Sequence, residues 1–380
     1  MSAERLRRTL VAGLRRNRFL NDREVEQVFL RVPREVFLPD VALEDVYRDA
    51  AILIKEQGGV GVSSSSQPAI MAIMLEMLDV RPGHRVLEIG AGSGYNAALL
   101  RELVGPGGQV TTIEIDAEVA QWARERLDTA GYTDVDVHEA DGALGWPAGA
   151  PWDRIIATVG AADIAPAWVD QLHDGGILVL PLGIGPLQAV VSLERRGQRL
   201  VSRGVEPAGF IRMRGQMADQ MGQYEVASGV YLVTESAETA DRVSVLLRTS
   251  PLNESWAYGP RDGLFAFAVV SGSPVVALWS TNADIGFTGA AYGRLSQDGR
   301  GLAIVSDSTL GSRLLIYGDA NAGADLQADE AHWVNVGKPG LRDFHIAAWP
   351  RGMAPQPGSG RLTYELPSWT LVIDWQTAGR

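Results

Sequence analysis

The chain has 380 residues, of which 46% are hydrophobic and 21% charged, and it carries a formal net charge of −12. This composition is typical of a globular protein, and the length predicts two domains rather than one. Residues 215–380 hold 11 basic and 17 acidic residues, and the chain contains no cysteine, which argues against charge-driven nucleic-acid binding and excludes disulfides and thiolate chemistry.

The N-terminal segment "MSAERLRRTLVAGLRRNRF" is amphipathic and rich in arginine. Its longest apolar run, "LVAGL", is too short for a signal sequence. No stretch approaches the roughly 18 apolar residues that a membrane span needs. We therefore expect a cytoplasmic protein that binds neither membrane nor nucleic acid.

The first half of the chain shows an alternation of helices and strands. Apolar residues at helical spacing predict two helices over residues 3–32, and "AIMAIMLEMLDV" predicts a third that starts near Pro68. Strands are then predicted at 85–89, 109–115, 134–138, 153–158 and 176–180, with helices at about 94–104, 117–130 and 163–173. This alternation predicts an α/β, doubly wound Rossmann-like fold with a parallel sheet. A hairpin is also predicted around Gly197, and it would close the sheet with antiparallel strands.

Beyond residue 214 the pattern changes to short β-like runs between turn residues. "GVYLVT", "VSVLLRT", "LFAFAVV", "VVALWST", "LAIVSD", "RLLIYG", "FHIAAWP", "RLTYEL" and "TLVIDW" are such runs, with about two helices expected between them. The pattern predicts a separate C-terminal α+β, β-rich domain. We therefore expect one domain at 1–214 and an accessory domain at 215–380.

A glycine-rich stretch, "VLEIGAGSGYN" (86–96), stands where the first sheet strand meets its helix. Such glycines let the backbone approach a ligand at a helix N-terminus. A nicotinamide-dinucleotide fingerprint needs a small residue at position 95, where this chain has Tyr95, and the acidic Glu88 before Gly90 is more typical of S-adenosylmethionine (SAM) sites. The alternatives are a dinucleotide site or an ordinary turn without a ligand.

Acidic residues also follow the next two strands. Glu114 ends the second strand and is placed to accept bonds from ribose hydroxyls, while Asp141 and Gly142 follow the third strand and are placed to hold adenine. Each residue alone is more often a solvated loop residue. Together they favour SAM, with the cofactor contacts predicted at Glu88, Gly90, Gly92, Gly94, Tyr95, Glu114, Asp141 and Gly142. The five histidines lack metal-ligand spacing, so no metal site is expected.

Several ordered motifs resemble the protein-L-isoaspartate (D-aspartate) O-methyltransferase family over residues 1–214. The segments that carry the resemblance are "RVPREVFLP" (31–39), "SQPAIMAIMLEML", "VLEIGAGSGYNAALL", "VGAADIAPAWVDQLHDGGILVLPLG" (159–183) and "RLVSRGVEPAGFIRM". The resemblance implies transfer of a methyl group from SAM to an aspartyl or isoaspartyl carboxylate, with S-adenosyl-L-homocysteine as the product. The methyl ester would then close to a succinimide (aspartimide).

The resemblance also implies substrate contacts. Ser66 is expected to hold the acceptor carboxyl as the catalytic residue, and the expected substrate-binding residues are Ser64, Ser65, Gln67, Val159, Gly160 and Ala161. The chain departs from the family at two places: serines replace the usual Thr-Ile-Ser at 64–66, and Asp163 stands where proline is expected. Both departures lie on the substrate side.

The long C-terminal extension favours a dedicated substrate in this interpretation. Long homologues of the family occur in actinobacterial gene clusters for ribosomally made peptides, lanthipeptides and graspetides. The expected partner is therefore a cyclised precursor peptide with one modified aspartate. The alternatives are a general isoaspartate repair enzyme with an accessory domain, which acts on damaged polypeptides, another SAM-dependent enzyme, and a binding protein for which SAM is only a ligand.

Overall fold

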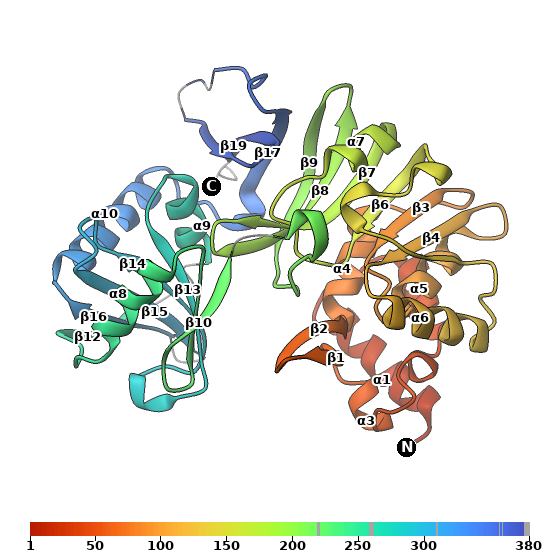
Figure 1. The fold of residues 1–380 in the computed structure, drawn as a ribbon, viewed down its shortest axis with the longest axis horizontal. Coiled ribbons are helices and arrows are strands. Elements are labelled where there is room, and N and C mark those ends of the chain that lie inside the picture. The colour runs from red at the N-terminus through yellow and green to blue at the C-terminus, as the bar shows by residue number, and fades with distance from the viewer. Residues whose placement is uncertain (219–220, 258–261, 309–310, 357, 359, 376–380) are drawn as a thin grey trace.

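The chain forms two lobes, each built around its own β-sheet, in a computed structural model (Figure 1). The structure describes residues 1–380 apart from 219–220, 258–261, 309–310, 357, 359 and 376–380. The N-terminal lobe starts with the red helices and the C-terminal lobe carries the sheet that starts at β10 (Figure 1). In the part of the chain that is described, no helix is long and apolar enough to cross a membrane.

The sheet of the N-terminal lobe has ten strands in the order β18-β19-β17-β9-β8-β7-β6-β3-β4-β5. Strands β5, β4, β3, β6 and β7 are parallel neighbours, whereas β7, β8 and β9 form an antiparallel meander. Their bounds are β3 (Arg85–Ile89), β4 (Gln109–Glu114), β5 (Asp136–Glu139), β6 (Trp152–Ala157), β7 (Leu172–Ile184), β8 (Leu187–Arg196) and β9 (Arg199–Pro207). The predicted doubly wound fold and the hairpin at Gly197 are confirmed.

Helices accompany the parallel strands, as the alternation predicted. Their bounds are α1 (Ala3–Arg16), α2 (Arg23–Arg31), α3 (Leu43–Val46), α4 (Pro68–Leu78), α5 (Tyr95–Val104), α6 (Ala117–Thr129) and α7 (Pro166–Gln171), with 3-10 turns η1 (Arg34–Phe37), η2 (Gly142–Leu144) and η3 (Pro147–Gly149). Pro68 occupies the first turn of α4, where a missing N–H costs nothing. The expected start of that helix is confirmed.

A two-stranded hairpin precedes α4 and was not predicted. It pairs β1 (Ile52–Gln57) with β2 (Val60–Ser65), so Ser63, Ser64 and Ser65 are strand residues rather than slack loop. Ion pairs connect the hairpin to the start of α6. The Nζ of Lys55 lies 2.7 Å from Asp116 and 2.8 Å from Glu118. A short polar hairpin has little periodic signal, which explains why the pattern did not indicate it.

The C-terminal lobe contains a seven-stranded antiparallel sheet in the order β10-β11-β13-β14-β15-β16-β12. Its strands are β10 (Gly222–Ala227), β11 (Val230–Thr234), β12 (Asn253–Ala257), β13 (Val275–Ser280), β14 (Gly289–Leu295), β15 (Gly301–Ser308) and β16 (Gly311–Gly318). Residues 215–343 also contain helices α8 (Ala237–Leu247), α9 (Asp262–Val270) and α10 (Asn321–Asn335) and turns η4 (Gly215–Met217), η5 (Ala283–Ile285) and η6 (Leu341–Asp343). The β-rich class is therefore confirmed.

Two of the predicted strand runs are helices. "VSVLLRT" lies largely in α8 and "LFAFAVV" lies in α9, so both predictions are wrong. In α9 the cause is burial on all sides, because residues 264–270 are each at most 7% exposed. A short, uniformly apolar run has no period that separates a buried helix from a buried strand.

The chain then returns to the first sheet. Strands β17 (Phe344–Pro350), β18 (Leu362–Glu365) and β19 (Trp369–Trp375) follow α10, and β17 pairs with β9. The expected division into 1–214 and 215–380 is therefore too simple, because the last strands extend the N-terminal sheet beyond the second lobe. One continuous apolar cluster joins these strands, β7, β8 and α9. The two lobes thus share a core.

Candidate functional site

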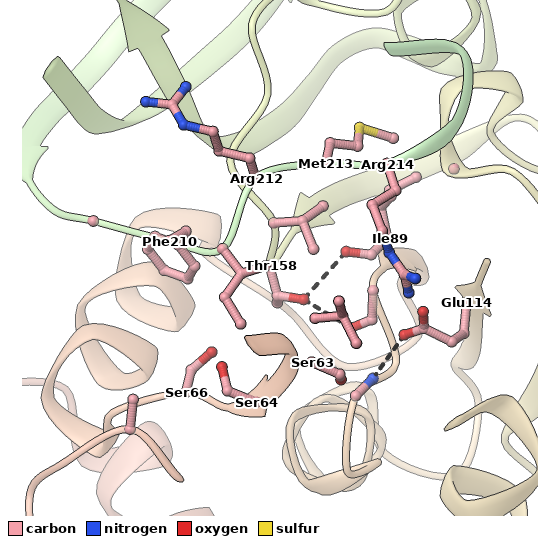
Figure 2. A pocket seen from close by; sticks show the side chains of 18 of the residues that line it. Ser63, Ser64, Ser66, Ile89, Glu114, Thr158, Phe210, Arg212, Met213 and Arg214 are labelled. Atoms are coloured by element: carbon pink, nitrogen blue, oxygen red, sulfur yellow. Dashed lines mark hydrogen bonds between the residues drawn. The ribbon is translucent and has the colours of Figure 1, made fainter. Parts of the chain in front are cut away.

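A cavity that brings together eight of the predicted site residues, which we call the principal cavity for that reason, lies at the carboxyl ends of the parallel strands β3, β4 and β6 (Figure 2). Its volume is about 280 Å³, near the lower end of small-molecule sites, which span roughly 300–1,000 Å³. This edge of a doubly wound sheet is where ligands bind in such folds, since the helix N-termini and strand-end loops meet there. The predicted residues that line it are Ser64, Ser66, Gln67, Gly90, Gly92, Glu114, Gly142 and Val159.

Two glycines leave the space that a ligand would use. Gly90 has φ +99°, and a Cβ placed there would lie 2.8 Å from Thr158 Oγ1 and 3.1 Å from Val159 Cγ1. Gly92 has φ +51°, and its Cβ would lie 3.2 Å from the carbonyl oxygen of Ser64. Only glycine combines this backbone with such close neighbours. Gly90 and Gly92 therefore form a loop without side chains just before the N-terminus of α5, as a SAM site requires. We call this loop the glycine cradle.

Glu114 supplies the acidic group of the cavity. Its carboxylate accepts N–H bonds from Gly92 at 3.2 Å and Asp116 at 3.3 Å, and burial raises its pKa while these bonds oppose the rise. Figure 2 shows the side chain beside Arg214 at the cavity wall. A fixed acceptor at this strand tip suits a pair of ribose hydroxyls, and that contact stays a prediction.

The serines occupy the side of the cavity opposite Ile89. The side chains of Ser64 and Ser66 lie next to one another and point toward Phe210 (Figure 2). Ser65 faces the other way, into the protein, where it is 3% exposed and accepts a 3.4 Å bond from Arg34. Ser65 therefore does not line the principal cavity.

Gln67 also borders the cavity, although its side-chain amide is hydrogen-bonded to Asp49. Its Nε2 donates to the Asp49 carboxylate at 3.1 Å, and Asp49 in turn accepts from the Ala69 N–H at 2.8 Å. These bonds fix the start of α4. The predicted substrate contacts of Ser64, Ser66 and Gln67 stay predictions.

Three of the predicted cofactor residues lie behind the glycine loop and, like Asp141, do not line the principal cavity. Glu88 is fully buried beneath the glycine loop, with its carboxylate oxygens bonded by Asn96 Nδ2 at 2.7 Å and Thr112 Oγ1 at 2.6 Å. Gly94 packs against α6, since a Cβ there would lie 3.1 Å from the Ala123 carbonyl. Tyr95 packs in the core and borders only a small cavity of about 20 Å³ behind the loop. We therefore assign these three to support of the loop.

Glu88 predicts a pH dependence of folding. Burial raises its pKa to about 7, although hydrogen bonds from Thr112 and Asn96 lower the pKa in part. A raised carboxyl pKa gives stability that is full below the unfolded value of about 4.5 and lost as pH rises through about 7. Relative to Glu88→Gln, the wild type should lose on the order of 3 kcal/mol of unfolding free energy between pH 4.5 and 7. Urea unfolding of both proteins at pH 5 and 8 measures the difference, and parallel profiles would contradict it.

The remaining predicted residues, Asp141, Gly160 and Ala161, do not line the cavity. Asp141 caps η2 by accepting from Ala143 N–H at 2.9 Å and also accepts from Gln216 N–H at 2.9 Å. Its carboxylate thus fixes the segment that leaves the N-terminal lobe, while Gly142 lines the cavity. Gly160 and Ala161 form bridges with Arg212 and Leu182 behind Val159. Contacts of these residues with adenine or substrate stay predictions.

The segment 207–214 was missed as part of the site. After β9 it crosses the cavity, to which it contributes Pro207, Ala208, Gly209, Phe210, Ile211, Arg212, Met213 and Arg214. It is held by Phe210 N–H donating to Gln188 at 2.7 Å and Arg214 lying 3.6 Å from Asp116. "GVEPAGFIRM" has no periodic or catalytic signal, so only the fold places it over the strand tips.

Thr158, which follows β6, was also missed. Its hydroxyl lies 2.7 Å from the Gly90 carbonyl and 3.2 Å from that of Ile89 (Figure 2), which fixes the glycine loop. Among the described residues, no group of three His, Asp or Glu side chains could hold a metal ion. The arrangement suits a nucleoside-type cofactor with an open acceptor side at Ser66.

Comparison with known proteins agrees with this geometry. The family model described as protein-L-isoaspartate(D-aspartate) O-methyltransferase matches residues 5–218. A protein-L-isoaspartate O-methyltransferase of Hyperthermus butylicus is 42% identical over 219 residues, which cover 55% of this chain and 89% of the relative. Another from Ignicoccus hospitalis is 38% identical over 209 residues, with 55% and 97% coverage.

A solved structure extends the likeness beyond this region. It is described as a protein-L-isoaspartate O-methyltransferase, has a TM-score of 0.55 at 25% identity, and covers 90% of this chain and 96% of its own. Coverage of that extent includes much of the chain that follows residue 218. The C-terminal lobe therefore has a counterpart in that structure.

Proposed function

The chain belongs to the protein-L-isoaspartate(D-aspartate) O-methyltransferase family, and on that premise we propose that it methylates the isoaspartyl carboxylate of polypeptides, as in repair. It is a SAM-dependent methyltransferase. The observation that carries the substrate proposal is that Ser64 and Ser66 line the same cavity as Gly90 and Gly92, with both serine side chains directed toward Phe210 (Figure 2).

The chemistry asks little acid–base work of the protein. A carboxylate acceptor is already ionised at neutral pH, since its reference pKa is about 4. When bound, SAM supplies an electrophilic methyl group, so that an oxygen–carbon bond forms as the sulfur–carbon bond breaks and S-adenosyl-L-homocysteine leaves. The residues of the chain need only bind, align and desolvate the two partners.

Three parts of the site perform this alignment. The Ser66 hydroxyl is placed to donate a hydrogen bond to the acceptor carboxyl, and its own carbonyl is held by Arg34 at 3.1 Å. The glycine cradle and Glu114 hold the nucleoside side. The segment 207–214 covers the space between them, with Phe210 over the serines (Figure 2), and excludes water from the reacting groups.

The sequence alone favoured tailoring of a cyclised, ribosomally made precursor peptide. That preference rested on the extension beyond residue 214. The extension no longer favours it, because a solved structure named as an isoaspartate methyltransferase covers 90% of this chain. The comparisons support the alternative of isoaspartyl repair, and the tailoring of lanthipeptide or graspetide precursors has no support among them.

The test is mass spectrometry after incubation with SAM and matched peptides. We expect a linear isoaspartyl peptide to gain one methyl group and then lose methanol as the succinimide closes, and its aspartyl twin to react far more slowly. A cyclised precursor peptide that reacts while the linear isoaspartyl peptide does not would overturn the proposal in favour of tailoring. Absence of any methylated product from all three would indicate a protein that only binds SAM.

Replacement of Ser66 by alanine tests the acceptor side. Loss of one hydrogen bond to a charged group costs about 1.5–3 kcal/mol, so kcat/KM for the isoaspartyl peptide should fall roughly 10- to 100-fold. Affinity for S-adenosyl-L-homocysteine, measured by calorimetry, should stay within about twofold. Ser66→Thr, which retains a hydroxyl, should recover part of the activity. A loss of cofactor affinity in Ser66→Ala would contradict the assignment.

A further inference from the structure

A second cavity of about 490 Å³ lies beyond the cofactor cavity and is built partly by the C-terminal strands. We call it the C-terminal cavity. Its walls are the loop after β6 (162–166), the β7–β8 turn at Gly183 and Gly185, the segment 216–218, Glu235 and the β18–β19 turn (364–368). Arg212 lines both cavities, and Figure 2 shows its side chain directed away from the serines. The two spaces are therefore neighbours across one residue.

The wall formed by the β18–β19 turn is hydrogen-bonded to the loop after β6 in the N-terminal lobe. The Trp369 Nε1–H donates to the Ile164 carbonyl at 2.8 Å in a buried bond. The carboxylate of Asp163, which is 7% exposed, accepts a hydrogen bond from the Ile164 N–H at 2.9 Å and interacts with Ser368, and burial raises its pKa. Asp163 stands where the family pattern has proline. This departure thus serves to dock the C-terminal turn beside the acceptor side.

A third attachment fixes the far side of the same wall. The Tyr364 hydroxyl interacts with the backbone of Gly185, while burial raises the pKa of Tyr364. A Cβ on Gly185 would lie 3.7 Å from that hydroxyl. The cavity is therefore bounded by ordered elements of both parts of the chain rather than by a loose tail.

The charge of the C-terminal cavity is predominantly negative. Glu235 and Glu365 are exposed residues on its wall, and Asp163 lies deeper. Glu365 keeps solvent access, with 52% of its side chain exposed, although it contacts Thr370 and Arg351. Arg212 is the cavity's one lining cation among the described residues. Ligands with positive charge are favoured by this balance.

We propose that the C-terminal cavity is a subsite for the polypeptide on one side of the acceptor residue and that it selects lysine or arginine there. The proposal rests on the proposed function, since it takes the acceptor to lie at Ser66. A peptide whose acceptor occupies the first cavity passes Arg212 and enters the second. Glu235 and Glu365 then attract a basic side chain. The C-terminal lobe and the returning strands thereby gain a role in substrate choice.

The test is steady-state kinetics with isoaspartyl peptides that differ only in the residues that flank the acceptor. Peptides carry lysine, alanine or glutamate at each of the first four positions on either side. Exposed ion pairs contribute up to about 1 kcal/mol each, so we expect lysine on one side to lower KM by about 5- to 20-fold relative to glutamate, with little change in kcat. The preference should weaken at high salt.

Variants assign the preference to this cavity. Glu235→Gln combined with Glu365→Gln should remove most of the lysine preference and leave the KM of the alanine peptide and the affinity for S-adenosyl-L-homocysteine nearly unchanged. The matched control is Glu238→Gln, which lies three residues from Glu235 and pairs with Arg242 outside the cavity. This variant should retain the full preference.

The outcomes are distinct. If the wild type methylates all peptides with equal KM, or if the double variant retains the preference, the subsite proposal is overturned and the proposed function stands. If no isoaspartyl peptide is methylated, the proposed function fails and the subsite proposal fails with it. A lysine preference that the double variant loses and Glu238→Gln retains supports the subsite.

Discussion

Gly90→Ala should abolish SAM binding at micromolar concentrations. The new Cβ would lie 2.8 Å from Thr158 Oγ1 and 3.1 Å from Val159 Cγ1, at a backbone φ of +99°. The loop must move to relieve these contacts, and the Thr158 bonds to the Ile89 and Gly90 carbonyls hold it in place. We expect the affinity for S-adenosyl-L-homocysteine to fall at least 100-fold by calorimetry, with loss of activity.

The control separates backbone strain from loss of the cradle. Gly83 has a similar φ of +87° and nothing within 4 Å of its Cβ position. Gly83→Ala therefore carries only the strain of a left-handed residue, about 1–2 kcal/mol, and should keep full cofactor affinity at a temperature where it is folded. Gly90→Ala with normal affinity would show that the ligand does not use the cradle.

Arg34→Met should be the most destabilising single change near the acceptor side. The Arg34 guanidinium is fully buried and donates to the Val46 carbonyl at 3.0 Å and the Ser66 carbonyl at 3.1 Å, and also to Ser65 Oγ. It further packs on the Tyr95 ring at 5.8 Å. Removal leaves several buried acceptors without a donor, which costs about 3–5 kcal/mol. Urea unfolding measures this loss.

A catalytic effect should accompany it, because Arg34 ties the serine strand to the segment 46–50. At a temperature where circular dichroism shows a folded variant, kcat for the isoaspartyl peptide should fall about 100-fold, while affinity for S-adenosyl-L-homocysteine changes less than threefold. Arg34→Lys should recover little, since an ammonium cannot reproduce the planar fork. An unchanged kcat in the folded variant would refute the positioning role.

The matched control for Arg34 is Arg31→Met on the preceding helix. Arg31 pairs with Glu102 at the surface, where 60% of its side chain is exposed. Exposed pairs contribute about 0–1 kcal/mol, so this variant should unfold near the wild-type midpoint and keep its activity. Both variants lose one positive charge, so the difference between them measures the effect of losing the buried hydrogen bonds of Arg34.

The fold and the cofactor could be predicted from local sequence patterns, namely the strand–helix alternation and the glycine-rich loop, and both features are present in the structure. Parallel strands with crossover helices place successive strand tips on one edge, so Gly90, Glu114 and Gly142 had to converge once the alternation was recognised. Contact at Glu88, Gly94 and Tyr95 could not be judged in this way. The motif gives their positions in the chain, but not that the side chains of Glu88 and Tyr95 are buried and that Gly94 packs against α6.

The substrate side was less accessible to sequence reasoning. The prediction of a dedicated peptide substrate depended on the length of the chain beyond residue 214 and not on where those residues lie in the fold. Strand β17 pairs with β9, about 150 positions earlier in the chain, and Ser368 contacts Asp163, about 200 positions earlier. Such contacts carry no periodic signal in a single sequence.

The sequence by itself determined the parallel sheet, the glycine cradle, the serine segment and the family, because each depends on residues close together in the chain or on a fixed strand order. Only the tertiary structure decided what covers the cradle and what borders the acceptor. The segment 207–214, the serine-bearing hairpin and the β18–β19 turn come from distant parts of the chain. Burial of shared apolar surface brings them together, and that packing is specified by the whole core rather than by any local pattern.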